Sequence, residues 1–296
     1  MHFSYNGLKI GLDHDGDFSF LSHAHADHSN KIKKHSKVIA SEETIALAGF
    51  SNLEKAKFNT DIKLHEAGHM LGARQLLVSN DGTVSVYTGD ISVKKNIFGY
   101  SADIVECNEL IIEATYGGNP TYKFPDNEQL YSDISMWIKS NDDANLIIGC
   151  YDMGKAQEMI KILNERCGIA PVINEKAEHI CKVYGSFGIS LDRLVVGCEE
   201  AEEVMNRRFV SIVPMRHAKR YFASRLAEAF GKKTLCAVAT GWALNYRFDS
   251  DAAFPLSDHA DFYELAYYIE QSNARKINFF AGDGNKVLGY LKNGYV

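Results

Sequence analysis

Proline is scarce in this chain, which has 5 prolines and 23 glycines among its 296 residues. This composition excludes collagen-like repeats and proline-rich linkers. No run of apolar residues reaches the roughly 18 that a membrane span needs, so no membrane partner is expected. The N-terminal residues lack the basic and then apolar pattern of a secretory signal. We therefore expect a cytoplasmic protein.

An excess of positive charge and closely paired cysteines are also lacking. Lysine and arginine total 32 against 38 aspartate and glutamate residues, a net charge of −6, which excludes a globally basic nucleic-acid binder but leaves a local basic face open. The six cysteines form no C-x-x-C pair and lie in apolar strings. We therefore expect reduced, mostly buried thiols rather than a disulfide framework or a zinc ribbon.

Hydrophobic residues make up 46% of the chain, which is typical of a globular protein, and the length predicts about two domains. The first third has short apolar strands and tight turns, and Asn80-Asp81-Gly82 has the composition of a β-hairpin turn. In this part we expect a helix at 41–48 and strands at 9–13, 18–21, 75–79, 83–88 and 109–115.

Strands alternate with helices in the middle of the chain, a pattern typical of a mostly parallel sheet. Strands are expected at 145–151, 171–173, 194–198, 209–214 and 234–240, and helices at 154–166, 175–184 and 218–230. Residues 120–235 are therefore interpreted as a separate α/β unit. In the tail, helices are expected at 261–271 and 285–291, with a strand at 277–281.

The strongest chemical feature is the segment from Ser22 to His28, which reads S-H-A-H-A-D-H and follows an apolar strand. Imidazole nitrogens and carboxylate oxygens are the usual ligands of zinc. Alternate side chains of an extended segment project to the same side, so His23 and His25 can reach one ion. A turn after them would bring Asp27 and His28 toward a second ion.

Three more candidate ligands lie far apart in the chain. His69 is flanked by glycines, Asp90 follows a strand in the sequence T-G-D, and His259 precedes a helix. Taken singly, each is an ordinary surface or core residue. Together they complete two sets of metal ligands.

These motifs, H-x-H-x-D-H, then G-H, then T-G-D, resemble the metallo-β-lactamase fold. Three further segments resemble motifs of the β-CASP nucleases: E-A-T-Y-G at Glu113–Gly117, Y-D-M-G-K-A-Q-E at Tyr151–Glu158 and S-D-H-A-D at Ser257–Asp261. The resemblance extends from Leu21 to about Phe262. It is nearest to the ligase-associated DNA exonuclease and Artemis-like branch, and the RNA-processing branch is a close competitor.

The resemblance implies a four-layer αββα core built from residues 1–119 and 236–296, with an inserted parallel-sheet α/β domain, the β-CASP domain, at 120–235. It places the active site in the groove between them. It also implies two Zn²⁺ ions, with Mn²⁺ tolerated, that share a hydroxide able to attack a phosphodiester. The implied ligands are His23, His25 and His69 for the first ion, Asp27, His28 and His259 for the second, and Asp90 as a bridge.

Other residues carry implied roles in catalysis and substrate binding. Asp27 is catalytic as well as a ligand, and Glu113 orients its neighbours. Arg216, His217 and Lys219 lie in P-M-R-H-A-K, which resembles the R-H-P-K stretch of the Artemis-like branch. His217 either protonates the leaving oxygen or binds phosphate, and the alternative is a surface histidine.

Lys155 follows Gly154 at the start of an expected helix, where free N–H groups can bind phosphate, and the alternative is a simple tight turn. The stretch from Arg207 to Lys233 has eight basic residues and one acidic residue, a net +7, which suits either a phosphate backbone or a solvated basic face. A smaller basic cluster follows the histidine motif, at Lys31, Lys33, Lys34 and Lys37. Tyr116 and Trp242 are candidates for base stacking or for buried packing.

The expected function is a metal-dependent nuclease that hydrolyses phosphodiester bonds of single-stranded or end-frayed DNA or RNA, as an exonuclease. Two alternatives stay open. One is a metallohydrolase of the same core that acts on a small ester or thioester, and the other is a non-catalytic scaffold for nucleic-acid processing. No oligomeric state follows from the sequence.

Overall fold

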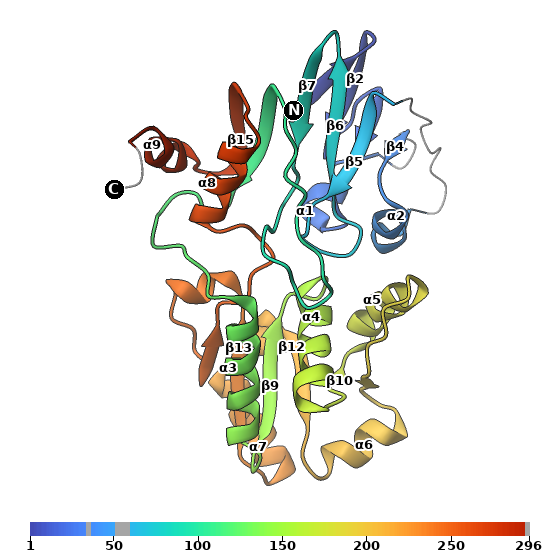
Figure 1. Cartoon of the computed structure of the whole chain (residues 1–296). Coiled ribbons are helices and arrows are strands. Elements are labelled where there is room, and N and C mark those ends of the chain that lie inside the picture. Colours follow the sequence, from blue (N-terminus) through green and yellow to red (C-terminus); the bar gives the residue numbers. More distant parts are fainter. Residues whose placement is uncertain (34–36, 51–59, 294–296) are drawn as a thin grey trace. The chain divides into compact units, whose positions relative to one another are not determined.

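The chain divides into two compact units in the computed structural model, which describes residues 1–33, 37–50 and 60–293 (Figure 1). The first unit consists of Met1–Lys123 and Asp258–Val296, and the second of Phe124–Ser257. Lys34, part of the basic cluster after the histidine motif, lies outside the described residues.

The first unit contains two mixed sheets. The four-stranded sheet has the order β1 (His2–Tyr5), β2 (Leu8–Leu12), β3 (Phe18–Phe20) and β4 (Val38–Ile39). The five-stranded sheet has the order β15 (Lys276–Gly282), β8 (Glu109–Ala114), β7 (Thr83–Tyr87), β6 (Arg74–Asn80) and β5 (Ile62–Glu66). The predicted hairpin joins β6 to β7, where Asp81 and Gly82 both have positive φ, of 49° and 75°, as its two-residue turn requires.

Apolar side chains of the two sheets pack against each other and form the core of this unit. The first sheet contributes Phe3, Ile10, Leu12, Phe20 and Ile39, and the second contributes Ile62, Leu76, Val78, Tyr87 and Ile111. Helices lie on the outer faces of the sheets. Ala48, the last residue of α2 (Glu42–Ala48), packs against the buried cluster of Leu21, Ile32 and Val38. In α8 (Phe262–Gln271), the Tyr268 hydroxyl donates a hydrogen bond to the Gln75 side chain on β6. The helices α1 (Ala26–Ser29) and α9 (Asn285–Asn293) complete the unit.

The second unit is built on a six-stranded sheet in which every pairing is parallel. Its order is β11 (Leu194–Val195), β10 (Val172–Ile173), β12 (Val210–Pro214), β9 (Asn145–Cys150), β13 (Thr234–Ala239) and β14 (Ala252–Phe254). The helices are α3 (Asn127–Ser140), α4 (Lys155–Ile162), α5 (Glu175–Ser186), α6 (Glu199–Met205) and α7 (Arg220–Phe230). All six residues of β9 are buried, as expected of a strand that is covered on both faces.

These two units confirm the predicted fold class, a layered α/β protein with a separate parallel sheet. The second unit ends at Ser257 rather than at residue 235, because β13 pairs with β9 and β14 then extends the same sheet. Helices α3 and α6 were not predicted, although Asp126 caps the first turn of α3. The helix expected at 154–166 is α-helical to Ile162 and continues as a π-helical turn over Leu163–Cys167.

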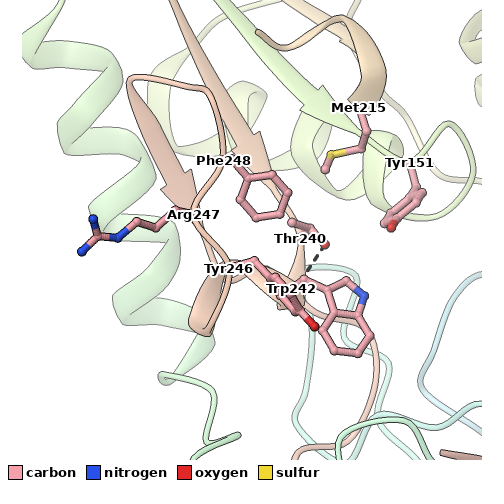
Figure 2. Close-up of a pocket in the computed structure, with 7 residues that line it drawn as sticks. All are labelled: Tyr151, Met215, Thr240, Trp242, Tyr246, Arg247 and Phe248. Atoms are coloured by element: carbon pink, nitrogen blue, oxygen red, sulfur yellow. Dashed lines mark hydrogen bonds between the residues drawn. The ribbon is translucent and has the colours of Figure 1, made fainter.

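Two further expectations concern the cysteines and membrane spans. All six cysteines are free thiols, and four of them are buried. Within the described ranges, no helix combines the length and the apolar character that crossing a bilayer requires. At the carboxyl edge of the second sheet, Tyr151 follows β9, Met215 follows β12 and Thr240 follows β13 (Figure 2).

Candidate metal centre

The histidine motif begins where β3 of the first unit ends. The chain runs extended through His25, which is the N-cap of α1, so that alternation along a strand positions His23 and His25 and a helical turn positions Asp27 and His28. His23 and His28 are buried, whereas the side chain of Asp27 is 78% exposed. The predicted strand followed by a turn is therefore present.

Two glycines allow the other loops to reach this motif. Gly68 precedes His69 and has φ of +73°, and a Cβ there would lie 2.3 Å from the Ser92 carbonyl oxygen. Gly89 precedes Asp90 and has φ of +56°, and a Cβ there would lie 2.5 Å from the Ser22 Cβ. A side chain at either position would clash and strain the backbone, so glycine is required for the close approach.

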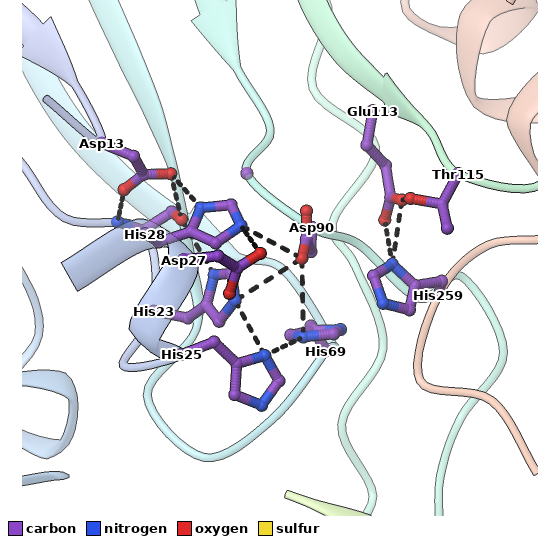
Figure 3. A network of polar contacts seen from close by, with 12 residues as sticks. Asp13, His23, His25, Asp27, His28, His69, Asp90, Glu113, Thr115 and His259 are labelled. Atoms are coloured by element: carbon purple, nitrogen blue, oxygen red, sulfur yellow. Dashed lines mark hydrogen bonds and ion pairs between the residues drawn. The ribbon is translucent and has the colours of Figure 1, made fainter. Parts of the chain in front are cut away.

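Asp90 lies at the centre of the cluster (Figure 3). Its Oδ2 atom is 3.5 Å from His23 Nε2, 3.4 Å from His28 Nε2 and 3.8 Å from His69 Nε2. His25 Nδ1 is 3.1 Å from His23 Nε2 and 3.3 Å from His69 Nε2. His23 and Asp90, which are 67 positions apart in the chain, thus lie close enough for both to bind the same metal ion.

The spacing of these atoms can be compared with that of a tetrahedral zinc site. Zinc bonded to nitrogen at about 2.0–2.1 Å places neighbouring ligand atoms about 3.3–3.4 Å apart. The four separations given above for His23, His25, His69 and Asp90 run from 3.1 Å, between His23 Nε2 and His25 Nδ1, to 3.8 Å, between His69 Nε2 and Asp90 Oδ2. One ligand atom from each of His23, His25, His69 and Asp90 lies within 4.8 Å of the others. The donor set therefore fits a divalent metal ion.

The remaining predicted ligands lie on either side of Asp90. His28 Nε2 is 3.6 Å from Asp27 Oδ2, and His28 also contacts Asp90. Asp90, Glu113 and His259 form a second possible ligand group, in which one ligand atom from each residue lies within 4.8 Å of the others. The structure therefore brings all seven predicted ligands together, with Asp90 common to both parts.

Glu113 is fully buried beside His259. Its Oε2 is 2.9 Å from His259 Nδ1 and accepts a 2.6 Å hydrogen bond from the Thr115 hydroxyl, and its Oε1 accepts a 2.7 Å bond from the Ile91 N–H. His69 is held in a similar way, since its Nδ1 lies 2.7 Å from the Asp258 carbonyl oxygen. Fixing Nδ1 determines the orientation of each ring and leaves Nε2 as the nitrogen that could coordinate a metal ion.

Asp13 is a member of the site that the sequence analysis missed. It is buried directly after β2, and its Oδ2 lies 2.7 Å from His28 Nδ1 while accepting bonds from the hydroxyls of Ser22 and Tyr87. Its Oδ1 accepts a 2.7 Å bond from the Ser22 N–H. The available signal was an acidic residue immediately after an apolar strand, the same signal that marked Asp90.

Burial and charge divide the imidazoles into two kinds. Burial lowers the pKa of His69 to about 3 and that of His23 well below its usual value. Burial also disfavours the charged form of His28, but hydrogen bonds to Asp13 and Asp90 outweigh it and raise its pKa to about 10. For His259, the Glu113 carboxylate outweighs burial and raises the pKa to about 9.

The same balance governs Asp90. Burial alone would raise the pKa of this carboxyl group, but the hydrogen bond to His28 and the charge of His259 hold the pKa well below its ordinary range. Asp90 is therefore a carboxylate and His23 and His69 are neutral imidazoles, whereas the raised pKa values of His28 and His259 mean that a metal ion would have to displace a proton from each of these two rings. A carboxylate and neutral imidazoles are the forms in which such side chains coordinate metals.

The predicted substrate-binding residues belong to the second unit. Arg216, His217 and Lys219 follow β12 and are exposed, and the Arg216 Nε atom donates to His217 Nε2 at 3.1 Å. Lys155 is the first residue of α4 but is only 4% exposed, and this burial argues against direct contact with a phosphate backbone.

The basic stretch from Arg207 to Lys233 is partly neutralised within the second unit. Three of its cations form ion pairs: Arg220 with Asp251, Arg225 with Glu228 and Lys233 with Asp143. In the first unit, Tyr116 is buried and packs edge-on against Tyr122, which favours packing over base stacking for this ring. Trp242 is half-buried.

The chain matches no model of a known protein family, but it is similar to several known proteins. It is 31% identical over 281 residues to a probable DNA ligase from Opitutus terrae, covering 88% of this chain and 26% of that protein. It is 31% identical over 167 residues to an RNase J-like protein from Methanocaldococcus jannaschii, covering 54% and 39% respectively. It is 23% identical over 323 residues to DNA cross-link repair protein SNM1 from Arabidopsis thaliana, covering 96% and 64%.

The chain thus spans between 26% and 64% of the length of these relatives. A crystallised protein of unknown function from Enterococcus faecalis shares the fold, with a TM-score of 0.57, 13% identity and coverage of 90% of this chain and 79% of that one. The order of the motifs, the paired sheets with a separate parallel-sheet unit, and these relatives agree with one another: the chain is similar to the β-CASP nucleases of the metallo-β-lactamase fold.

Proposed function

We propose that this protein is a metal-dependent nuclease that hydrolyses phosphodiester bonds of DNA or RNA, starting from a strand end. The observation that carries the proposal is the convergence of His23, His25 and His69 on Asp90 at ligand–ligand spacing. Relatives named as an RNase J-like protein and as a DNA cross-link repair protein support a nucleic-acid substrate. Because the chain matches only part of each relative, its own activity needs a direct test.

We assign the seven ligands to two ions, zinc in the first instance and manganese as the alternative. We assign His23, His25 and His69 to one ion and Asp27, His28 and His259 to the other, with Asp90 shared between the two sets. When bound, such ions neutralise charge on phosphate oxygens and lower the pKa of a water molecule so that it is nucleophilic near neutral pH.

The protein's own residues orient the site. Asp13 fixes the ring of His28 through Nδ1 and so directs Nε2 toward Asp90. Glu113 acts in the same way on His259, as a positioning residue. Asp27 has the most exposed carboxylate of the set, and we assign it the additional role of accepting a proton from the attacking water.

We further propose that the first unit is the catalytic metallo-β-lactamase domain and the second unit is the β-CASP insert. In the second unit we assign phosphate contacts to Arg216 and Lys219 and proton donation to His217. Exposure of these side chains supports the assignment, since a substrate can reach them. Free thiols at all six cysteines suit a reducing, cytoplasmic setting.

The test uses end-labelled single-stranded DNA and RNA of matched sequence, incubated with the full chain and zinc or manganese over a time course. The proposal expects a ladder that shortens from one end. His69→Ala should abolish cleavage, whereas His179→Ala, at an exposed position on α5, should leave it unchanged. Full activity of His69→Ala would refute the assigned site. Hydrolysis of a small aryl ester with no attack on either oligonucleotide would instead identify the alternative hydrolase.

A further inference from the structure

A hollow of about 390 Å³ opens at the carboxyl edge of the parallel sheet in the second unit. It is formed by loops that follow three adjacent strands: Tyr151 after β9, Met215 after β12, and Thr240 and Trp242 after β13. Its volume falls within the range of about 300–1,000 Å³ typical of small-ligand pockets.

The topology of the sheet marks this edge as a place for a ligand. Strand β9 leads through α4 to β10 on one side of it, whereas the neighbouring β12 leads through α7 to β13 on the other side. Neighbouring strands whose connections leave in opposite directions form a switch point, and open α/β sheets bind ligands beyond the carboxyl ends of such strands. The loops after β9 and β12 both line this hollow.

Aromatic rings dominate the lining, and we call this hollow the aromatic cup. Tyr151, Trp242, Tyr246 and Phe248 line it together with Met215 and Thr240 (Figure 2). The rings of Trp242 and Tyr246 are 5.8 Å apart at an interplanar angle of 74°. In this edge-to-face arrangement the ring that presents its edge keeps both of its faces uncovered by the other ring, so a flat ligand can stack against it.

Two of these rings are unusually exposed for aromatic side chains. Tyr151 is 51% exposed and Tyr246 is 59% exposed. Neither is needed to fill the core of the unit, which is formed by other residues such as Ile147, Val172 and Phe209. Adjacent exposed rings around a hollow indicate a binding surface rather than packing.

Three basic residues lie on the segments that form the aromatic cup. Arg247 lines it, with its side chain pointing away from the rings in Figure 2, Arg216 follows the lining residue Met215, and Lys219 lies three positions further along. All three are exposed, and in the part of the chain that the structure describes none of them has a carboxylate within ion-pair distance. The ligand that this charge favours is a flat aromatic group attached to an anion.

We propose that the aromatic cup binds one unpaired nucleobase of a single-stranded nucleic acid, while Arg216 and Lys219 contact the adjoining phosphates. The inference rests on the proposed function and names the strand state of its substrate. Stacking is tolerant of base identity because every base has a π face. In a duplex these faces are covered by neighbouring pairs, so the cup selects single strands.

The chain offers a direct optical test because it contains only two tryptophans, Trp137 and Trp242. Trp137→Phe leaves Trp242 as the only tryptophan fluorophore. This full-length variant is titrated with a thymidine oligomer of about ten nucleotides and with an abasic phosphodiester oligomer of equal length, in EDTA so that the probes stay intact. The oligothymidine is expected to quench Trp242 emission to saturation, and the abasic oligomer is not.

A second measurement follows the anisotropy of a labelled oligothymidine with Trp137 in place. Tyr246→Ala should weaken binding by about 5- to 140-fold, the range for one stacked base. Tyr221→Ala, at an aromatic residue on α7 that is 75% exposed and outside the cup, should leave the affinity unchanged. Equal affinity for the abasic and thymidine oligomers, or no effect of Tyr246→Ala, would overturn the proposal.

Two further measurements distinguish a free nucleotide from a strand as the ligand, and binding by the aromatic cup from nuclease activity. Thymidine monophosphate should bind more weakly than the oligomer, and equal affinity would mean that the ligand is a free nucleotide and not a strand. A metal-loaded chain that quenches with oligothymidine but cleaves no oligonucleotide would support the aromatic cup and refute the nuclease. Cleavage without any base-dependent quenching would support the nuclease and refute the cup.

Discussion

Asp13 is predicted to stabilise the candidate metal centre by fixing the orientation of the His28 ring, and Asp13→Asn tests this role. Three groups converge on Oδ2: the Ser22 hydroxyl at 2.7 Å, the Tyr87 hydroxyl at 2.8 Å and His28 Nδ1 at 2.7 Å. Oδ1 accepts from the Ser22 N–H at 2.7 Å. An asparagine amide can keep one oxygen acceptor, but its NH₂ group cannot accept from the other donors.

The magnitude follows from the groups that lose their acceptor. A buried donor left unpaired costs about 1–3 kcal/mol, and a bond to a charged group contributes about 1.5–3 kcal/mol. In either orientation of the amide at least one buried donor loses its acceptor, and the bond to His28 loses the charge of its acceptor, so we expect a loss of about 2–4 kcal/mol in the free energy of unfolding. Removing a residue that orients a metal ligand should weaken zinc binding by about 10- to 100-fold.

The assay combines urea unfolding with zinc competition against a chromophoric chelator. Asp17→Asn is the matched control, because Asp17 lies in the same loop between β2 and β3 but is exposed and accepts one bond, from the Lys9 N–H. It should change stability by less than about 0.5 kcal/mol and leave zinc affinity as it is. A folded Asp13→Asn protein with unchanged zinc affinity would refute the role assigned to Asp13.

Three other perturbations have defined outcomes. Gly89→Ala should lower the melting temperature and weaken zinc binding, because its Cβ would lie 2.5 Å from the Ser22 Cβ, and Gly82→Ala, where nothing lies within 4 Å, should cause only the strain of a positive φ. Raising free zinc to about 100 times its dissociation constant should add about 2.7 kcal/mol to stability in a thermal melt, and a His69→Ala protein should lack most of this gain. Ile148→Ala, on the fully buried strand β9, should cost about 2–5 kcal/mol in urea unfolding, whereas a cost below about 1 kcal/mol would show that β9 is not central.

The local part of the site was predictable because it depends on few residues. The segment from Ser22 to His28 carries its own geometry, an extended stretch followed by a helical turn, and both features occur in the structure. His69, Asp90 and His259 were found through the order of motifs, since no periodicity of the chain reveals which loops meet. The glycine before His69 gave a physical hint, and the structure shows that Gly68 and Gly89 both have the positive φ that a close approach requires.

The missed features depend on contacts over long sequence separations. Asp13 accepts a hydrogen bond from Tyr87, which is 74 positions away, and no residue near Asp13 in the sequence indicates this partner. The end of the second unit was placed too early because β13 was not paired with β9, which lies about 90 residues earlier in the chain. Lys155 looked like a phosphate ligand from its place after Gly154, but the packing of α4 buries it.

Two metal ions that share Asp90 are the centre of the proposed mechanism. A crystal of the zinc-loaded protein, measured with X-rays on either side of the zinc absorption edge, would locate these ions through their anomalous scattering. We predict two peaks about 3.5–4 Å apart, one enclosed by His23, His25 and His69 and both within bonding distance of Asp90. Zinc peaks located elsewhere, or a cluster with no peak beside Asp90, would contradict the account.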